Sequence, residues 1–190
     1  RDQPFVSRGG LKLAEAIRLF KIDIRHKLAM DIGASTGGFT DCLLQHQAAY
    51  VFAVDSGYNQ LDWKLVTDNR VKNLEKCNFR YLSLNEIGTF VDIIVIDVSF
   101  ISLEKILGNC LNFLIKNGAV IALIKPQFEA GKSNVEKGGL VSNPRMHSSV
   151  IKSITSFAQS LGFRAEGVFA SPIQGKKSGN QEFLMHLIKP

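Results

Sequence analysis

A glycine-rich segment between an apolar run and an amphipathic run constrains the fold more than any other part of this chain. It reads Met30-Asp31-Ile32-Gly33-Ala34-Ser35-Thr36-Gly37-Gly38-Phe39-Thr40. A short apolar strand that ends near an acidic residue, then a glycine loop, then a helix is typical of the start of an α/β domain, where the loop grips a ligand. The segment therefore predicts both the fold class and the place of a binding site.

The spacing of the glycines narrows the choice of ligand. Gly33 and Gly38 have the spacing of a P-loop, but Phe39 stands where a phosphate-binding loop needs lysine. Ser35 occupies the position at which a dinucleotide-binding loop has its second glycine. Asp31 would repel a phosphate and suits an ammonium group, such as that of S-adenosylmethionine. We therefore predict a methyl-donor site in the loop 33–39, with Asp31 near the amino-acid end of the donor and S-adenosylhomocysteine as the product.

The next apolar run supports this interpretation. Residues 50–54 are apolar and lead into Asp55, where an acidic residue accepts hydrogen bonds from a ribose diol in related sheets. Taken alone, Asp55 indicates a loop cap at a strand end equally well. The glycine loop that precedes it favours the ribose contact.

Apolar and amphipathic segments alternate along the chain. We predict strands at residues 28–32, 50–55, 71–74, 91–97, 119–124, 164–170 and 182–188, and helices at 10–20, 38–47, 62–67, 103–115 and 144–161. The loop 171–181 is too short for a helical crossover, so the last two strands should form an antiparallel hairpin. We thus expect one α/β domain over residues 1–190, with a lead-in and first helix in 1–27. Its fold should be Rossmann-like and typical of methyltransferases, a seven-stranded, mostly parallel sheet ending in that hairpin.

The amino-acid composition limits the kinds of molecule that the protein is expected to bind. The 190 residues carry a net charge of +6, which favours a polyanion such as nucleic acid. Basic residues recur in the predicted loops, at Arg8, Lys64, Lys76, Arg80, Lys132, Lys137, Arg145, Lys176 and Lys177. Three scattered cysteines and four scattered histidines have no metal-ligand spacing, and no signal peptide or membrane-spanning run is present. We expect a cytoplasmic protein without a metal or a membrane partner. Because the chain begins at Arg1, we expect it to be an excerpt from a longer protein.

Candidate catalytic residues stand at the strand ends, where ligands bind in open α/β sheets. Asp97 ends the fourth predicted strand, Lys125 follows the fifth, Glu182 opens the last, and Lys12 lies on the first helix. A lysine that closes a fully apolar strand is either a general base for an alcohol or a surface lysine with a buried stem. Burial or a second cation favours the neutral form that a base requires, and neighbouring carboxylates favour the charged form. The sequence leaves this balance open.

These residues lie in ordered motifs that resemble the TlyA (haemolysin A) family of FtsJ-like ribosomal RNA 2'-O-methyltransferases. The motifs include Ser7-Arg8-Gly9-Gly10-Leu11-Lys12-Leu13, the glycine loop, Asp97-Val98-Ser99-Phe100, Lys125-Pro126-Gln127-Phe128-Glu129 and Gly179-Asn180-Gln181-Glu182-Phe183. The resemblance implies a catalytic tetrad of Lys12, Asp97, Lys125 and Glu182. It also implies a cytidine of rRNA or a ribosomal subunit as substrate, and an S4-type RNA-binding domain N-terminal to this chain. Asn78 stands where FtsJ-like relatives have an aspartate near the adenine, which leaves that contact open.

Alternative functions remain at this point. An amino-group methyltransferase acting on a base would have two prolines after the fourth strand, which Asp97-Val98-Ser99-Phe100 lacks. Pyrimidine C5 methylation needs a cysteine nucleophile near the donor, and no cysteine stands there. A non-catalytic RNA-binding or assembly module would not need the tetrad. The family name suggests a membrane-lytic toxin, but the sequence lacks the strongly amphipathic basic helix that such a toxin would need.

Overall fold

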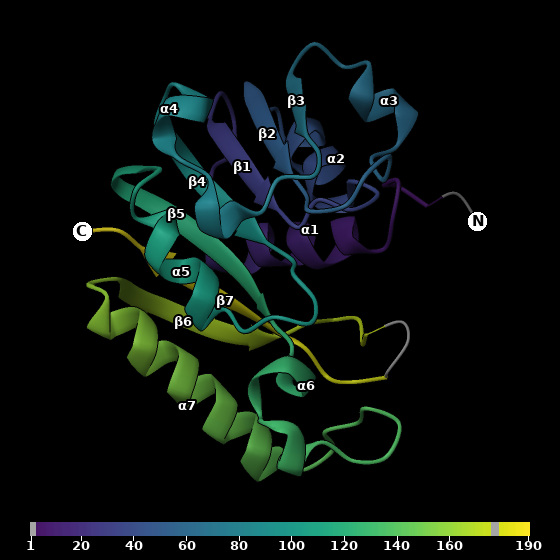
Figure 1. The fold of residues 1–190 in the computed structure, drawn as a ribbon, viewed down its shortest axis with the longest axis vertical. Helices are drawn as coiled ribbons and strands as arrows, with labels where there is room; N and C mark the ends of the chain where they lie inside the picture. The colour runs from purple at the N-terminus through teal and green to yellow at the C-terminus, as the bar shows by residue number, and fades with distance from the viewer. Residues whose placement is uncertain (1–2, 176–178) are drawn as a thin grey trace.

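A seven-stranded sheet forms the centre of the protein, seen in a computed structural model that describes residues 3–175 and 179–190 (Figure 1). The strand order is β3-β2-β1-β4-β5-β7-β6. The strands are β1 (Leu28–Ile32), β2 (Tyr50–Val54), β3 (Val71–Leu74), β4 (Val91–Ile96), β5 (Leu114–Ile124), β6 (Arg164–Ala170) and β7 (Phe183–Ile188). The first five run parallel, and β7 pairs antiparallel with both β5 and β6. The predicted fold class, including the C-terminal antiparallel hairpin, is confirmed.

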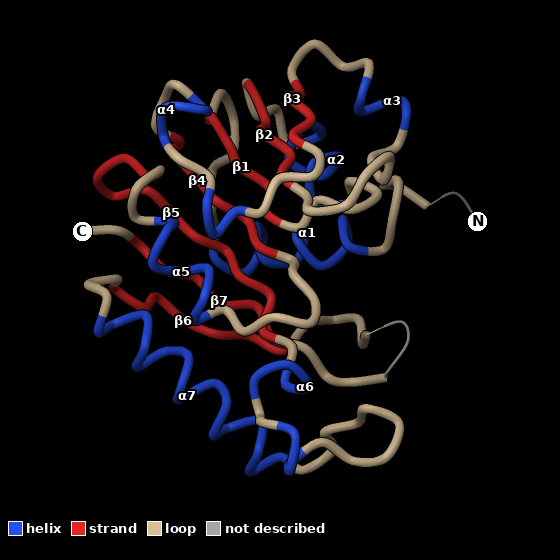
Figure 2. The backbone as a smooth tube through the Cα atoms, viewed as in Figure 1, coloured by secondary structure: helices blue, strands red, loops and turns tan. Residues whose placement is uncertain are grey.

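Helices cover both faces of the sheet (Figure 2). Helices α1 (Gly9–Phe20) and α2 (Gly38–Gln45) pack on one face, in a core that contains Ala29 and Val95. Helices α5 (Glu104–Cys110) and α7 (Pro144–Ser160) pack on the other, in a core that contains Met30 and Ile94. Neighbouring strand residues thus enter opposite cores, as the alternation of side chains along a strand requires. This explains why residues 28–30 of β1 and 93–96 of β4 are apolar without interruption.

Several one-turn elements escaped prediction, because they are too short to show a hydrophobic period. They are η1 (Phe79–Tyr81), α4 (Leu84–Ile87), α6 (Pro126–Glu129) and η2 (Lys132–Asn134), and α3 (Trp63–Val66) is shorter than predicted. The predicted helix 103–115 was wrong at its end, since α5 stops at Cys110 and β5 already begins at Leu114. Residues 115–117 are exposed, and Asn117 has a left-handed backbone (φ 61°), so this part of the strand lacks the apolar pattern of a buried one.

The topology gathers the candidate residues at one edge of the sheet. Strands β1, β2, β4 and β5 are parallel, so their carboxyl ends lie together. Strand β7 runs the opposite way, and Phe183 at its start pairs with Ile124 at the end of β5. Glu182 is therefore delivered to the edge at which Lys125 stands. Within the described residues, no helix has the length and apolar character needed to cross a membrane.

Candidate active site

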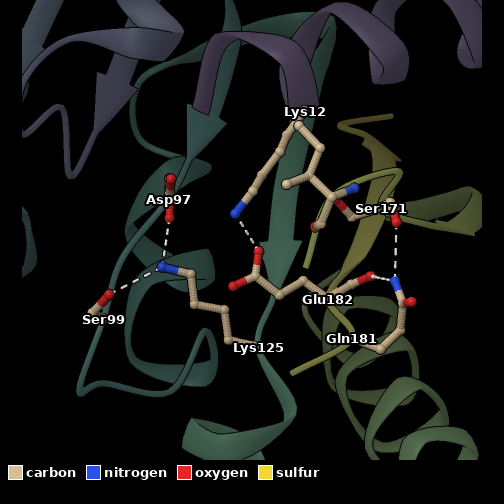
Figure 3. Close-up of polar contacts among 8 residues, drawn as sticks. Lys12, Asp97, Ser99, Lys125, Ser171, Gln181 and Glu182 are labelled. Carbon is tan, nitrogen blue, oxygen red and sulfur yellow. Dashed lines mark hydrogen bonds and ion pairs between the residues drawn. The ribbon is translucent and has the colours of Figure 1, made fainter. Parts of the chain in front are cut away.

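Two ion pairs join the four predicted catalytic residues (Figure 3). Lys125 Nζ lies 2.6 Å from Asp97 Oδ1, and Lys12 Nζ donates a hydrogen bond to Glu182 Oε2. The lysine side chains are only 10% and 12% exposed for Lys12 and Lys125, so each ammonium group is screened from water mainly by protein. Each lysine thus contacts one carboxylate. The sequence left open whether the neutral or the charged form of the lysine is favoured. The structure adds that each lysine is paired with a carboxylate.

Ser99 is a further partner of Lys125. Its Oγ accepts a hydrogen bond of 3.0 Å from Lys125 Nζ (Figure 3). Sequence reasoning did not single out this serine, although it lies within the Asp97-Val98-Ser99-Phe100 motif. The only available signal was its distance of two residues from Asp97, and the contact itself depends on how the chain turns after β4.

Glu182 is held by a small backbone network at the start of β7. Its carbonyl oxygen accepts hydrogen bonds from Ser171 N (2.8 Å) and Gln181 Nε2 (2.8 Å), and Gln181 Nε2 also donates to Ser171 O (3.0 Å). Asn180, which is fully buried, accepts from Val141 N and donates to Gly139 O. The two long loops that follow β5 and β6 are therefore tied together beside the ion pairs. The predicted loop cations Lys176 and Lys177 lie outside the described residues.

Two cavities meet at the candidate site. One, of about 620 Å³, is lined by Lys12, Lys125 and the loop residues Ala34, Thr36, Gly38 and Phe39, among others. The other, of about 650 Å³, is lined by Asp55, Asn78 and neighbouring residues. Both cavities are lined by Gly33, Ser35, Asp97 and Ser99. This shared wall is the point at which a ligand in one cavity would meet a ligand in the other.

The glycines of the loop allow close packing around this wall. Gly33 has φ +80°, and a Cβ atom there would lie 2.3 Å from the carbonyl oxygen of Asp97. Gly37 has φ +101°, and its Cβ would lie 2.3 Å from a methyl group of Leu65. A side chain would be strained at both positions by conformation and by space. The loop therefore lies directly against the chain segment that carries Asp97.

Asp55 and Asn78 lie in the second cavity, and both already bind backbone. Asp55 Oδ2 accepts from Ser35 N (2.7 Å) and its Oδ1 from Gly57 N (2.7 Å). Asn78 Oδ1 accepts from Arg80 N (3.1 Å) and caps η1. Asp55 is thus a loop cap, as one of the two sequence interpretations held. A carboxylate has about four acceptor positions, so Asp55 also has capacity for a ribose diol.

Asp31 lies deeper than its place in the sequence motif suggests. Its side chain is fully buried and lines neither cavity. Oδ2 accepts a hydrogen bond from Thr40 Oγ1 (2.7 Å), and among the described residues Oδ1 has no hydrogen-bond partner. Burial raises the pKa of Asp31 to about 7, the charges of Asp97 and Asp55 add to the rise, and the hydrogen bond from Thr40 opposes it. A direct contact between Asp31 and a ligand in either cavity is not part of this arrangement.

The sheet order, the glycine loop after β1 and the carboxylates at the strand ends define a class, the Rossmann-like S-adenosylmethionine-dependent methyltransferases. A solved structure of this class, magnesium protoporphyrin IX methyltransferase from Synechocystis with bound SAH, superposes with a TM-score of 0.65 over 96% of this chain and 82% of that one, at 11% identity. This likeness concerns the fold alone. In the described residues, no group of three or more histidine, cysteine, aspartate or glutamate side chains is arranged to hold a metal ion.

Within that class the chain belongs to the FtsJ-like methyltransferase family, which residues 5–189 match. It is 42% identical over 186 residues to the 16S/23S rRNA (cytidine-2'-O)-methyltransferase TlyA of Mycobacterium tuberculosis, covering 98% of this chain and 69% of that protein. A solved structure named as a hemolysin, from Streptococcus thermophilus, is 46% identical with a TM-score of 0.96, covering 100% of this chain and 68% of that one. The chain spans about two thirds of the length of such relatives.

Proposed function

We propose that this protein transfers a methyl group from S-adenosylmethionine to a ribose 2'-hydroxyl of RNA, with a cytidine of rRNA as the substrate. The observation that carries the proposal is the pair of lysine–carboxylate contacts, whose two lysines line the first cavity and one of whose carboxylates, Asp97, lies on the wall shared by both cavities. One cavity offers groups suited to a nucleoside and the other offers lysines suited to an alcohol. Membership of the FtsJ-like family and the likeness to a cytidine-2'-O-methyltransferase support this assignment.

The residues around the second cavity fit the methyl donor. Asp55 would accept hydrogen bonds from its ribose, and Asn78 lies where the adenine would be held. The loop 33–39 would hold its methionine part through Gly33 and Ser35, which line both cavities, and Asp97 at the shared wall would face the positive sulfonium. Asp31 would act from behind this loop, through its hydrogen bond with Thr40. When bound, the donor supplies a methyl group on a positively charged sulfur, which is already activated for transfer.

The two lysines have separate tasks in this proposal. Lys125 Nζ would take the proton of the 2'-hydroxyl, and Asp97, 2.6 Å away, would stabilise the resulting ammonium group. Lys12, held by Glu182, would fix the position of the ribose and balance charge in the first cavity. Much of the rate would come from aligning the hydroxyl oxygen with the methyl carbon. Lys12 lies on α1, and the other three residues directly flank β4, β5 and β7, so the alignment costs little rearrangement.

An RNA substrate agrees with the charge of the surface. Of the predicted loop cations, Lys76 stacks over Tyr58 (4.5 Å to the ring centroid) and Arg80 over Tyr81 (5.4 Å), and both tyrosines are exposed. Lys64 contacts Asp41 at 3.0 Å, so it contributes less net charge. Basic side chains bind phosphates with an affinity that falls steeply with salt. An S4-type domain that would locate the rRNA site remains an expectation from the resemblance.

The test replaces Lys125 and compares this variant with one that replaces a lysine of the preceding strand, β5. Lys125→Ala should lower methyl transfer from labelled S-adenosylmethionine to rRNA by at least about 10²-fold, the usual contribution of a general base. Donor affinity, measured by calorimetry, should change little. Lys116→Ala is the matched control, because Lys116 lies on β5, is exposed and is absent from both cavities. Its activity should equal that of the wild type.

The position of the label distinguishes the remaining functions. A methyl group on the ribose makes the adjacent phosphodiester resistant to alkaline cleavage, and this is the expected product. Label on a base nitrogen would overturn the proposal in favour of amino-group methylation, and full activity of Lys125→Ala would remove Lys125 from the catalytic step. Binding of RNA without any transfer, at saturating donor, would indicate a non-catalytic assembly module.

A further inference from the structure

Lys125 is held by two acceptors on the same turn of chain. Its Nζ donates to Asp97 Oδ1 at 2.6 Å and to Ser99 Oγ at 3.0 Å (Figure 3). Lys12, in contrast, has Glu182 as its carboxylate partner. The second contact of Lys125 has no role in the tetrad that the family resemblance implies.

The geometry of an amine gives this second contact a consequence. A lysine nitrogen is tetrahedral, with one position bonded to Cε and three positions left for protons or a lone pair. Asp97 and Ser99 accept from two of the three. The third is then fixed in direction, whether it carries the lone pair of the neutral amine or the last proton of the ammonium group. With Asp97 alone, the nitrogen could rotate about the Cε–Nζ bond and point this position elsewhere.

The turn that carries Ser99 is itself held in place. Phe100 has a left-handed backbone (φ 64°), which is uncommon for a bulky residue and persists only where neighbouring structure supports it. The support comes from α6, where Phe128 contacts the Phe100 ring (centroids 5.0 Å apart) and Glu129 accepts from Ser102 Oγ (2.7 Å) and Leu103 N (2.8 Å). Since Lys125 directly precedes α6, the same segment fixes both the amine and its serine partner.

Ser99 has no structural task that would explain this arrangement. Ser99 is an exposed residue, and it lines both cavities at their shared wall. Removal of its hydroxyl therefore leaves the core intact and changes only the wall.

We propose that Ser99 is a positioning residue that orients the free position of Lys125 Nζ toward the substrate hydroxyl. The inference rests on the proposed function. In the step it serves, the 2'-hydroxyl proton passes to Nζ and the hydroxyl oxygen forms a bond to the methyl carbon. The carbon–sulfur bond breaks at the same time, and its electron pair stays on sulfur. Ser99 gives up no proton in this step and acts through Lys125.

The experiment compares Ser99→Ala with Ser99→Thr, which keeps the hydroxyl. At saturating donor and saturating rRNA, Ser99→Ala should lower the rate of ribose methylation about 10- to 100-fold, with the KM for RNA and the Kd for S-adenosylmethionine within about twofold of wild type. Ser99→Thr should restore most of the rate. Ser153→Ala, which alters an exposed serine on α7, is the control and should match the wild type in every measurement.

Each outcome decides the inference separately from the proposed function. If the wild-type protein methylates ribose and Ser99→Ala is equally fast at saturation, the positioning role is wrong while the proposed function stands. A raised Kd for the donor with a normal saturated rate would make Ser99 a binding residue and also overturn the inference. Loss of thermal stability in both Ser99 variants would assign the residue to folding. No transfer by the wild type would contradict the proposed function itself.

Discussion

Replacing Gly33 with alanine should damage both folding and donor binding. Gly33 has φ +80°, a conformation that costs an L-residue about 1–2 kcal/mol. The new Cβ would lie 2.3 Å from the carbonyl oxygen of Asp97 and 3.1 Å from a methyl group of Val98. Forced overpacking of this kind typically costs about 1–3 kcal/mol. The sum predicts a loss of about 2–5 kcal/mol in the free energy of unfolding.

Gly88 offers a control for the conformational part of this loss. It also has φ +80°, but a Cβ atom there meets nothing within 4 Å. Gly88→Ala should therefore cost only about 1–2 kcal/mol. Urea unfolding of both variants isolates the contact with Asp97 as the difference between them. Because that contact pushes the chain at Asp97, Gly33→Ala should also weaken binding of S-adenosylmethionine in calorimetry, and Gly88→Ala should leave it unchanged.

Two results would refute this reasoning. Equal destabilisation of both variants would mean that the loop relaxes away from Asp97 without cost. Wild-type donor affinity in Gly33→Ala would mean that the loop and the strand end after β4 do not form one site.

Three further predictions concern other carboxylates of the site. Burial raises the pKa of Asp31 from its ordinary 3.8 to about 7. Between about pH 4 and 7 the folded state therefore keeps a proton that the unfolded chain releases. The free energy of unfolding should fall as the pH rises through this window. Asp31→Asn should remove that dependence, worth on the order of 4 kcal/mol, and urea unfolding at several pH values would detect it. An unchanged profile would contradict the burial argument. Asp55→Ala should weaken donor binding by about 1–3 kcal/mol in calorimetry, because the carboxylate accepts a hydrogen bond from Ser35 N and is expected to bind the ribose. Unchanged affinity would restrict Asp55 to loop capping. Glu129→Ala should lower stability by about 2–3 kcal/mol, because it leaves the donors Ser102 Oγ and Leu103 N without their acceptor. Glu129→Gln keeps one acceptor oxygen and should lose less in thermal unfolding, and wild-type stability of Glu129→Ala would show that neither bond matters.

The sequence predicted those features that depend on local pattern. The continuous apolar run of β4 predicted a strand buried on both faces, and the short loop before Glu182 predicted an antiparallel hairpin. Both predictions are confirmed. The tetrad positions were available because strand ends meet at one edge of a parallel sheet. The roles assigned to them stay predictions.

Features that depend on distant packing escaped prediction. Sequence places Asp31 at a loop mouth, but only the helix α2 above β1 determines that its carboxylate is fully buried against Thr40. The contact from Lys125 to Ser99 depends on a left-handed turn at Phe100, and no residue type there signals it. One-turn helices such as α6 lack a repeating pattern and depend on their neighbours for stability.

The contact between Lys12 and Glu182 spans 170 positions of the sequence. Strand β7 must enter the sheet between β5 and β6 before Glu182 reaches Lys12. Bringing together residues so far apart in the sequence has an entropic cost, and the pairing of β7 with β5 and β6 offsets this cost only when it forms. During synthesis, the site therefore stays incomplete until β7 has left the ribosome. A polypeptide that ends before β7 could fold its first strands and still lack one of its two ion pairs, so that assembly of the site is coupled to the addition of that strand.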